Sequence, residues 1–200
     1  MNIVLCTMGS RSIAPMLSSI CEYGGSFGLH VFRPMQKTFG ESYNIAMTDA
    51  FSFCDEMIIA NDDVVLWPNT MQLLIEDVIR AKMMHGDKAG FVAARADNIR
   101  PPQRIRLGEN CDMERARFVS PVFAWLSKKA FETARFPPLN WFSDDVMCED
   151  LNRQGFVHYF SRACIHHAGS LTIGGDYSKH INEARPWIRE NRPEYESLWF

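Results

Sequence analysis

The sequence predicts an α/β fold, a single compact domain in which helices flank a mostly parallel central sheet. Two observations support this. Short apolar runs rich in β-branched residues alternate with longer segments of helical spacing through the first half of the chain. The chain also has 200 residues, 46% of them hydrophobic, which is enough to build one domain core. Ligands of such sheets collect at the carboxyl ends of the strands, so binding residues are expected there.

Strand and helix alternate regularly in the first half of the chain. The expected strands are apolar runs bounded by glycine, proline or polar turns, at residues 3–7, 30–32, 57–60 and 91–94. Apolar residues three and four positions apart predict helices at residues 13–21, 43–53 and 70–84. The third helix has the clearest apolar stripe, formed by Leu73, Leu74, Val78 and Ile79.

The second half of the chain opens with a polar stretch, residues 95–117, which contains six arginines. A solvated loop with internal ion pairs is the favoured interpretation, and a lid that binds an anionic group is the alternative. The remaining expected strands are at residues 118–126, 156–160 and 163–166. The remaining expected helices are at residues 128–135, 144–154 and, as a terminal helix or tail, 186–200.

Composition excludes several classes of protein. A net charge of −3 argues against a general polyanion binder. The sequence has no run of 18 apolar residues, so no transmembrane segment is predicted. The first strand begins without the basic region of a signal peptide, so none is expected. The six cysteines are scattered singly and form no CxxC pair, which disfavours a zinc site. A reducing, cytoplasmic location is therefore expected.

The most informative segment is the apolar run Ile58–Leu66, which is interrupted by Asn61, Asp62 and Asp63. Adjacent carboxylates at the end of a buried strand repel each other and lose hydration, so a cation or hydrogen-bond donors must compensate them. Oxygen-rich clusters suit Mg²⁺ or Mn²⁺, often with substrate phosphates as further ligands. The alternative is an acidic turn that caps the helix after Pro68.

Three further groups follow other expected strands or begin helices. Asp144 and Asp145 start a helix, where capping explains one carboxylate better than the four acids present within seven residues. His166 and His167 end the last strand, and a neutral imidazole beside a carboxylate is a plausible metal ligand. The turn after the first strand could present backbone donors and a cation to a nucleotide, through Thr7, Gly9, Ser10 and Arg11.

Taken in order, these elements resemble the GT-A fold glycosyltransferases, particularly the family 2 type, from the first strand to about Thr172. The segment IIANDDV is similar to the metal-binding DxD-type motif, with Asn61 and Asp63 in its first and third places. The segment ESYNIA is similar to a helix whose asparagine, here Asn44, precedes that motif. WFSDDVMCEDLNRQGF resembles the acidic segment with the catalytic base, and IHHAGS resembles a His-Gly-Ser element that supplies a late metal ligand.

The resemblance implies a GT-A-like, Rossmann-like fold and an enzyme that moves a hexose or pentose from a nucleoside-diphosphate sugar to an acceptor hydroxyl, with inversion. The acceptor could be a glycan, a lipid-linked sugar, a protein or a modified nucleic acid. The implied cofactor is Mn²⁺ or Mg²⁺ on Asp63, with Asp62 and His166, and His167 is the alternative to His166. The implied base is Asp144, with Asp145 as the alternative.

Donor binding is assigned by the resemblance to the first half of the chain, residues 1–95, with acceptor binding and catalysis at 96–175 and a tail at 176–200. The donor-binding residues implied are Thr7, Gly9, Arg11, Asn44, Asn61 and Asp62. The chain departs from the family where its short second strand ends in Val31-Phe32-Arg33-Pro34, without the usual base-binding aspartate.

Two other functions fit the same residues. The first is a phosphohydrolase or nucleotidyltransferase, whose site the same carboxylates and histidines would form, with carboxylates bridging two metal ions. The second is a catalytically silent module that binds a nucleotide sugar without turnover, which the missing base-binding aspartate and Asn61 suggest.

Overall fold

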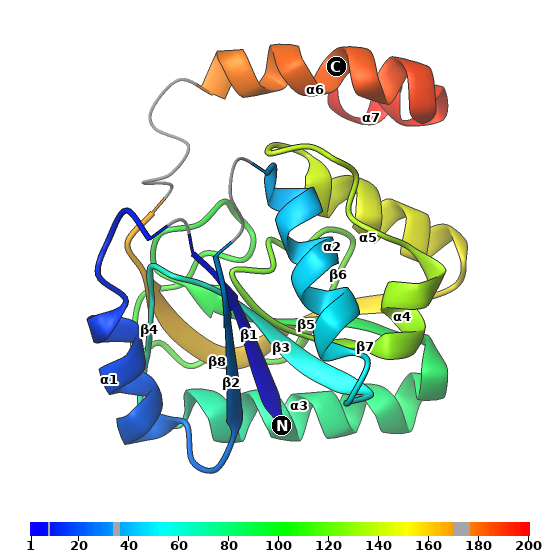
Figure 1. The fold of residues 1–200 in the computed structure, drawn as a ribbon. Helices are drawn as coiled ribbons and strands as arrows, with labels where there is room; N and C mark the ends of the chain where they lie inside the picture. Colours follow the sequence, from blue (N-terminus) through cyan, green and yellow to red (C-terminus); the bar gives the residue numbers. More distant parts are fainter. Residues whose placement is uncertain (8, 34–36, 170–176) are drawn as a thin grey trace.

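The computed structural model describes residues 1–7, 9–33, 37–169 and 177–200. In these residues an eight-stranded sheet has the order β2-β1-β3-β7-β5-β8-β4, and β6 pairs with β8 (Figure 1). The strands are β1 (Asn2–Cys6), β2 (Gly28–Phe32), β3 (Glu56–Asn61), β4 (Val64–Leu66), β5 (Ala89–Ala96), β6 (Glu114–Ala116), β7 (Phe123–Ser127) and β8 (Val157–His167).

Helices cover both faces of the sheet (Figure 1). The α-helices are α1 (Ala14–Tyr23), α2 (Phe39–Ala50), α3 (Thr70–His85), α4 (Lys128–Thr133), α5 (Ser143–Arg153), α6 (Tyr177–Asn191) and α7 (Glu196–Trp199). Two short 3-10 helices are η1 (Gly86–Lys88) and η2 (Pro193–Tyr195).

Most strands of the sheet run in one direction, as the sequence predicts. Strand β1 is parallel to β2 and β3, and β5 is parallel to β8. Strand β7 is antiparallel to both β3 and β5, so β3 and β5 run the same way. Five strands therefore share one direction, namely β1, β2, β3, β5 and β8, while β4 and β6 run against β8. The carboxyl ends of the five strands therefore meet at one edge of the sheet, where ligands are expected.

Successive residues of a strand pack alternately in two hydrophobic cores, one on each face of the sheet. Ile3 and Leu5 of β1 pack in the core beneath α1 and α3, whereas Val4 packs in the core beneath α2, α4 and α5. Strand β3 divides in the same way, with Ile58 and Ile59 on opposite faces. Burial on both faces explains the nearly continuous apolar runs of the sequence.

Some boundaries differ from the expected ones for identifiable reasons. Helix α2 begins at Phe39, because Thr38 and Glu41 form a reciprocal capping box. The two expected strands around Ser161 and Arg162 are one continuous strand, β8. The buried carboxylate of Asp77 on α3 accepts hydrogen bonds from Ser161 Oγ and from the backbone and side chain of Arg162, which satisfies the polar pair within the strand.

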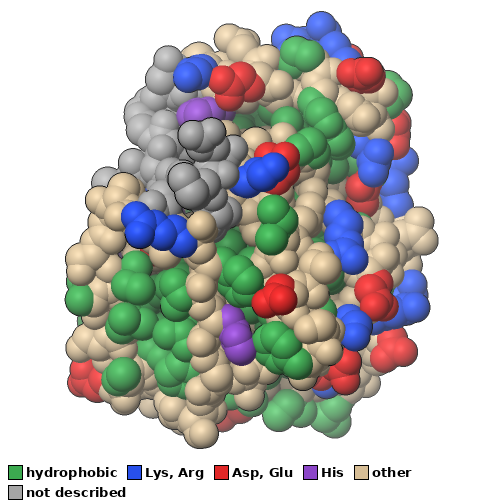
Figure 2. Space-filling model, in the orientation of Figure 1, with side chains coloured by type: hydrophobic (Ala, Val, Ile, Leu, Met, Phe, Trp, Pro, Cys, Tyr) green, Lys and Arg blue, Asp and Glu red, His purple; other side chains and the backbone are tan. Residues whose placement is uncertain are grey.

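The C-terminal helices pack against α5 and the loop before it. Their core is formed by Ala184, Ile188 and Tyr195 with Leu139 and Val146. In the described part of the chain, none of the helices has the length and hydrophobicity needed to span a bilayer. Figure 2 shows acidic and basic side chains interleaved along one side of the molecule, which has 21 basic and 24 acidic residues in its sequence.

Candidate active site

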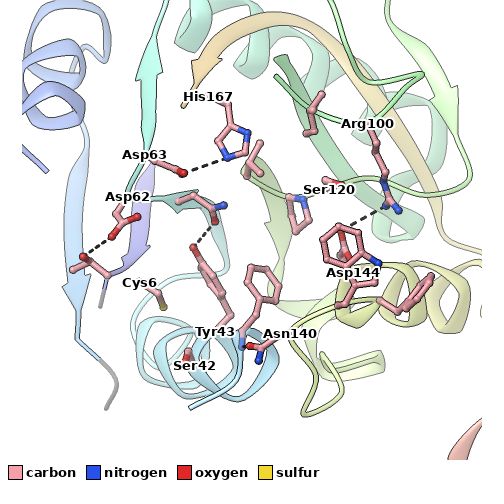
Figure 3. Close-up of a pocket in the computed structure, with 18 of the residues that line it drawn as sticks. Cys6, Ser42, Tyr43, Asp62, Asp63, Arg100, Ser120, Asn140, Asp144 and His167 are labelled. Carbon is pink, nitrogen blue, oxygen red and sulfur yellow. Dashed lines mark hydrogen bonds and ion pairs between the residues drawn. The ribbon is translucent and has the colours of Figure 1, made fainter. Parts of the chain in front are cut away.

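A cavity of about 300 Å³ opens at the edge of the sheet where the five strands end (Figure 3). Its walls come from the ends of β1, β3 and β8, the segment after β5, the start of α2 and the start of α5. Figure 3 shows Asp62, Asp63 and His167 on one side of the cavity, and Arg100 and Asp144 on the other. Residues far apart in the sequence thus share one hollow.

Polar neighbours hold the acidic turn between β3 and β4. Thr7 donates a hydrogen bond from Oγ1 to Oδ2 of Asp62 at 2.6 Å. Arg11 contacts both carboxylates, with Nε 3.2 Å from Oδ1 of Asp62 and Nη1 2.9 Å from Oδ2 of Asp63. Tyr43 donates to the carbonyl oxygen of Ala60 at 2.7 Å, which fixes the end of β3 below the turn.

His167 faces Asp63, with Nε2 3.3 Å from Oδ1. Burial opposes the charged imidazolium, but the hydrogen bond and charge of Asp63 raise the pKa of His167 above its ordinary value. Burial also disfavours the charged form of Asp63, but the bond and charge of His167, and then Arg11, hold the pKa of Asp63 below its usual range. Each of the two groups therefore favours the charged form of the other at the cavity wall.

His166, the metal ligand that the sequence resemblance implies, lies elsewhere. Its Nδ1 atom is 2.6 Å from Oδ2 of Asp97, its side chain is 46% exposed, and it does not line the cavity. Successive strand residues face opposite sides, so only one of the two histidines can point inward. The alternative left open by the sequence, His167, is the one that contacts Asp63. Ser170 of the same motif lies outside the described residues.

Asp144 and Asp145 begin α5 and share one counter-ion, Arg100. Both oxygens of Asp145 accept hydrogen bonds from Arg100, at 2.8 and 2.6 Å, and the Asp145 side chain is buried. Asp144 is 3.6 Å from the same guanidinium and retains a partly exposed carboxylate in the cavity wall. Burial, and then the charge of Asp145, raise the pKa of Asp144 to about 6.

The other expected donor-binding residues have different surroundings. Thr7 and Asn61 line the cavity, and Asn61 Oδ1 accepts from Tyr43 at 3.1 Å. Gly9 has a φ of 68°, and its N–H donates to Oγ1 of Thr7 at 3.0 Å, which shapes the turn. Asn44 does not line the cavity; its amide bonds the backbone of Phe136 in both directions. The structure thus gives Asn44 a role in positioning the chain before α5.

Aromatic side chains close the cavity on the α5 side. Trp141 and Phe142 both line it. Phe142 has a φ of 61°, in the left-handed region that non-glycine residues seldom adopt. Its ring centroid is 5.3 Å from those of Trp199 and Phe200, so the C-terminal helices support this wall from behind.

The sequence does not single out several residues of the cavity, and three of them bear on its chemistry. Arg100 was one of six arginines in a polar stretch, and only its distance to Asp144 and Asp145 sets it apart. Tyr43 and Cys6 belong to segments that the sequence predicts as ordinary helix and strand, yet both line the cavity. Burial, and next the charge of Asp62, raise the pKa of the Cys6 thiol to about 12, so it stays neutral.

The chemistry of Asp63 and His167 fits a divalent cation. Nδ1 of His167 is 2.7 Å from the carbonyl oxygen of Asn98, and since a carbonyl only accepts, that nitrogen carries hydrogen. Donation of one ring N–H to a backbone carbonyl is typical of metal-binding histidines, and it leaves Nε2 as the nitrogen that would face an ion beside Asp63. Across the residues described, no three His, Cys, Asp or Glu side chains converge as a complete ligand set. A bound ion would therefore need ligands from substrate or water.

No family model matches the sequence, and none of the curated proteins matches it significantly. Solved structures do resemble it. GalNAc-T7 with UDP, GalNAc and Mn²⁺ has a TM-score of 0.63 at 9% identity, over 83% of this chain and 43% of that one. S. aureus TarS 1–349 with UDP-GlcNAc has a TM-score of 0.54 at 10% identity, over 89% and 60%. The chain has a GT-A-like fold.

The GT-A-like fold also matches A197 from STIV, with a TM-score of 0.51 at 13% identity over 82% of this chain and 80% of A197. This chain thus spans most of A197, but only 43% of GalNAc-T7 and 60% of the TarS fragment. At such identities the likeness concerns the fold, and the resemblance expected from the sequence is confirmed at that level.

Proposed function

We propose that the protein is a metal-dependent glycosyltransferase that moves a sugar from a nucleoside-diphosphate sugar to an acceptor hydroxyl. One observation carries the proposal: a single cavity has a carboxylate beside an imidazole, Asp63 and His167, on one wall and a carboxyl of raised pKa, Asp144, on the other. Charge builds up on the diphosphate as it leaves, which requires a cation, and a proton leaves the acceptor, which requires a base. The two walls of the cavity would meet these two requirements.

The residues divide between binding and proton transfer. Asp63 and His167 would hold Mn²⁺ or Mg²⁺, with Asp62 behind them, and the bound ion would neutralise the departing diphosphate. Thr7 and Arg11, with Asn61 nearby, line the wall on which the donor would lie, and Gly9 shapes the turn that carries Thr7. The aromatic rings of Trp141 and Phe142 offer flat apolar surfaces to a sugar.

Asp144 is the base in this proposal. Both oxygens of Asp145 accept hydrogen bonds from Arg100 and its side chain is buried, so its carboxylate is less available to an acceptor than that of Asp144. Asp144 keeps a partly exposed carboxylate in the cavity, and a carboxyl with a pKa of about 6 accepts a proton efficiently near neutral pH. Direct attack from that side would invert the anomeric centre.

Two further parts of the proposal concern context. The six cysteines, all in the described part of the chain, are free in the structure, which supports a reducing compartment such as the cytoplasm. The acceptor would be a glycan, a lipid-linked sugar, a protein or a modified nucleic acid. A phosphohydrolase with two bridged ions is less favoured, because Arg100 already occupies both oxygens of Asp145.

The test pairs nucleotide binding with turnover. UDP-, GDP- and dTDP-sugars are titrated with and without Mn²⁺, and the melting temperature and the release of nucleoside diphosphate are measured. One of these donors is expected to raise the melting temperature only when the metal is present. Because no acceptor is supplied, the sugar of that donor should be transferred slowly to water. Binding without release would favour the silent module. If no donor binds under any condition, the transferase proposal fails.

A further inference from the structure

Arg11 occupies the carboxylates that the proposed metal would need. Its Nε and Nη1 atoms bridge Asp62 and Asp63 at 3.2 and 2.9 Å, and the three side chains are 20%, 8% and 6% exposed. Two adjacent carboxylates with so little solvent around them require a compensating cation. In this arrangement the guanidinium supplies that positive charge.

The remaining carboxylate oxygens have other partners. Oδ2 of Asp62 accepts the hydroxyl of Thr7 at 2.6 Å, and Oδ1 of Asp63 faces Nε2 of His167 at 3.3 Å. A divalent ion held between Asp63 and His167 would therefore share the Asp63 carboxylate with Arg11. The guanidinium and the divalent ion would repel each other on one small carboxylate, and both would depend on its single negative charge.

We infer that Arg11 is an internal competitor of the divalent cation, which stabilises Asp62 and Asp63 before the ion binds and leaves Asp63 when it does. This inference rests on the metal site of the proposed function. Arg11 belongs to the turn after β1 and lines the cavity, so a displaced guanidinium remains on the donor wall. There its planar fork suits the oxygens of a diphosphate.

The inference predicts opposite changes in two affinities. In R11Q, Mn²⁺ should bind about tenfold more tightly than in the wild type, since a charge-assisted competitor is lost. Nucleoside diphosphate should bind about tenfold more weakly at saturating Mn²⁺, because the fork is missing. Free Mn²⁺ is counted by electron paramagnetic resonance, and UDP and GDP binding is measured by calorimetry. R80Q, which removes an exposed arginine of α3, should behave as the wild type.

If the R11Q variant does not fold, a second measurement on the wild-type protein still tests the inference. In wild-type protein labelled with ¹⁵N-arginine, Mg²⁺ titration should shift the Nε–H resonance of Arg11, which R11K identifies by its disappearance. Equal or weaker Mn²⁺ binding by R11Q, or an Arg11 resonance that stays fixed while Mg²⁺ binds, overturns the inference.

Failure of the inference differs from failure of the proposed function. If donors bind and release diphosphate with no metal in both the wild type and R11Q, Arg11 does not compete with an ion, while transferase activity survives. If R11Q gains Mn²⁺ affinity but no nucleotide sugar binds either protein, competition stands and the transferase proposal fails.

Discussion

Nε2 of His167 lies 3.3 Å from Oδ1 of Asp63, whereas the ring of the preceding residue, His166, bonds Asp97. The two neighbours therefore have different expected roles in metal binding. We expect H167A to weaken Mn²⁺ binding by about 10- to 100-fold, because a ligand is lost, and H166A to change it by less than about threefold. Mn²⁺ titration followed by electron paramagnetic resonance compares them. A larger loss in H166A would return the ligand to the position first expected from the sequence.

Asp144 is expected to carry proton transfer. D144N should lower the rate of sugar release from the donor by about 10²- to 10⁴-fold while the donor dissociation constant stays nearly unchanged. The exposed Asp87, on η1, offers a matched control in D87N. Release of nucleoside diphosphate, followed by chromatography, gives the rates. Retention of more than half of the wild-type rate in D144N excludes Asp144 as the base.

The raised pKa of Asp144 also predicts a pH dependence of activity and stability. The base acts when ionised, so the rate should rise as pH increases through about 6 and then level off.

A carboxyl whose folded pKa exceeds its unfolded value stabilises the fold below the unfolded pKa, and this contribution is lost as pH rises through about 6. D144N should therefore be more stable than the wild type at pH 7.5, by about 1 to 3 kcal/mol, and this gain should vanish near pH 4. Urea unfolding at both pH values measures it.

Arg100 is expected to set the pKa of Asp144. Its positive charge opposes the effect of Asp145, so R100M should move the midpoint of the pH–rate profile upward by about one unit or more. R100K, which keeps the charge but loses the two-pronged bond, should move it less. The buried Asp145 would lose its partner in R100M, at a cost of about 3 to 5 kcal/mol in the free energy of unfolding. An unchanged midpoint in a folded R100M protein contradicts this role.

Phe142 combines backbone strain with a structural ring. At its φ of 61°, glycine is favoured over alanine, so F142G should be more stable than F142A by about 1 kcal/mol, the reverse of their order in an ordinary helix. Both should be less stable than the wild type, because the contacts with Trp199 and Phe200 are lost. Urea unfolding of the three proteins gives the order. Greater stability of F142A than of F142G would mean that the left-handed geometry is not maintained.

Much of the fold could be predicted because local patterns and long-range structure agree. The apolar run before Asn61 forms β3, and the acids after it fall at the sheet edge where parallel strands end. The continuity of β8 could not be predicted in this way. Ser161 and Arg162 resemble a break in the sequence, and they are accommodated by Asp77, 84 and 85 positions away. Partners at such separations leave no local pattern.

The candidate site shows a similar division. Its acidic clusters were predicted because paired carboxylates at strand and helix ends are conspicuous. Which histidine faces the cavity depends on the register of β8 beside β4, where His167 pairs with Val64. The partner of Asp145 depends on how the loop that carries Arg100 folds over the start of α5. Register and loop path are set by the whole molecule.

The support that the last two residues give to the ring of Phe142 has a practical consequence. Phe200 lies directly behind the cavity wall, while Met1 precedes β1 at the opposite edge of the sheet (Figure 1). A purification tag or fusion partner joined after Phe200 would therefore begin beside the wall of the candidate cavity. The same extension joined ahead of Met1 would emerge far from it, which makes that end the safer attachment point for affinity handles, fluorophores and surface immobilisation.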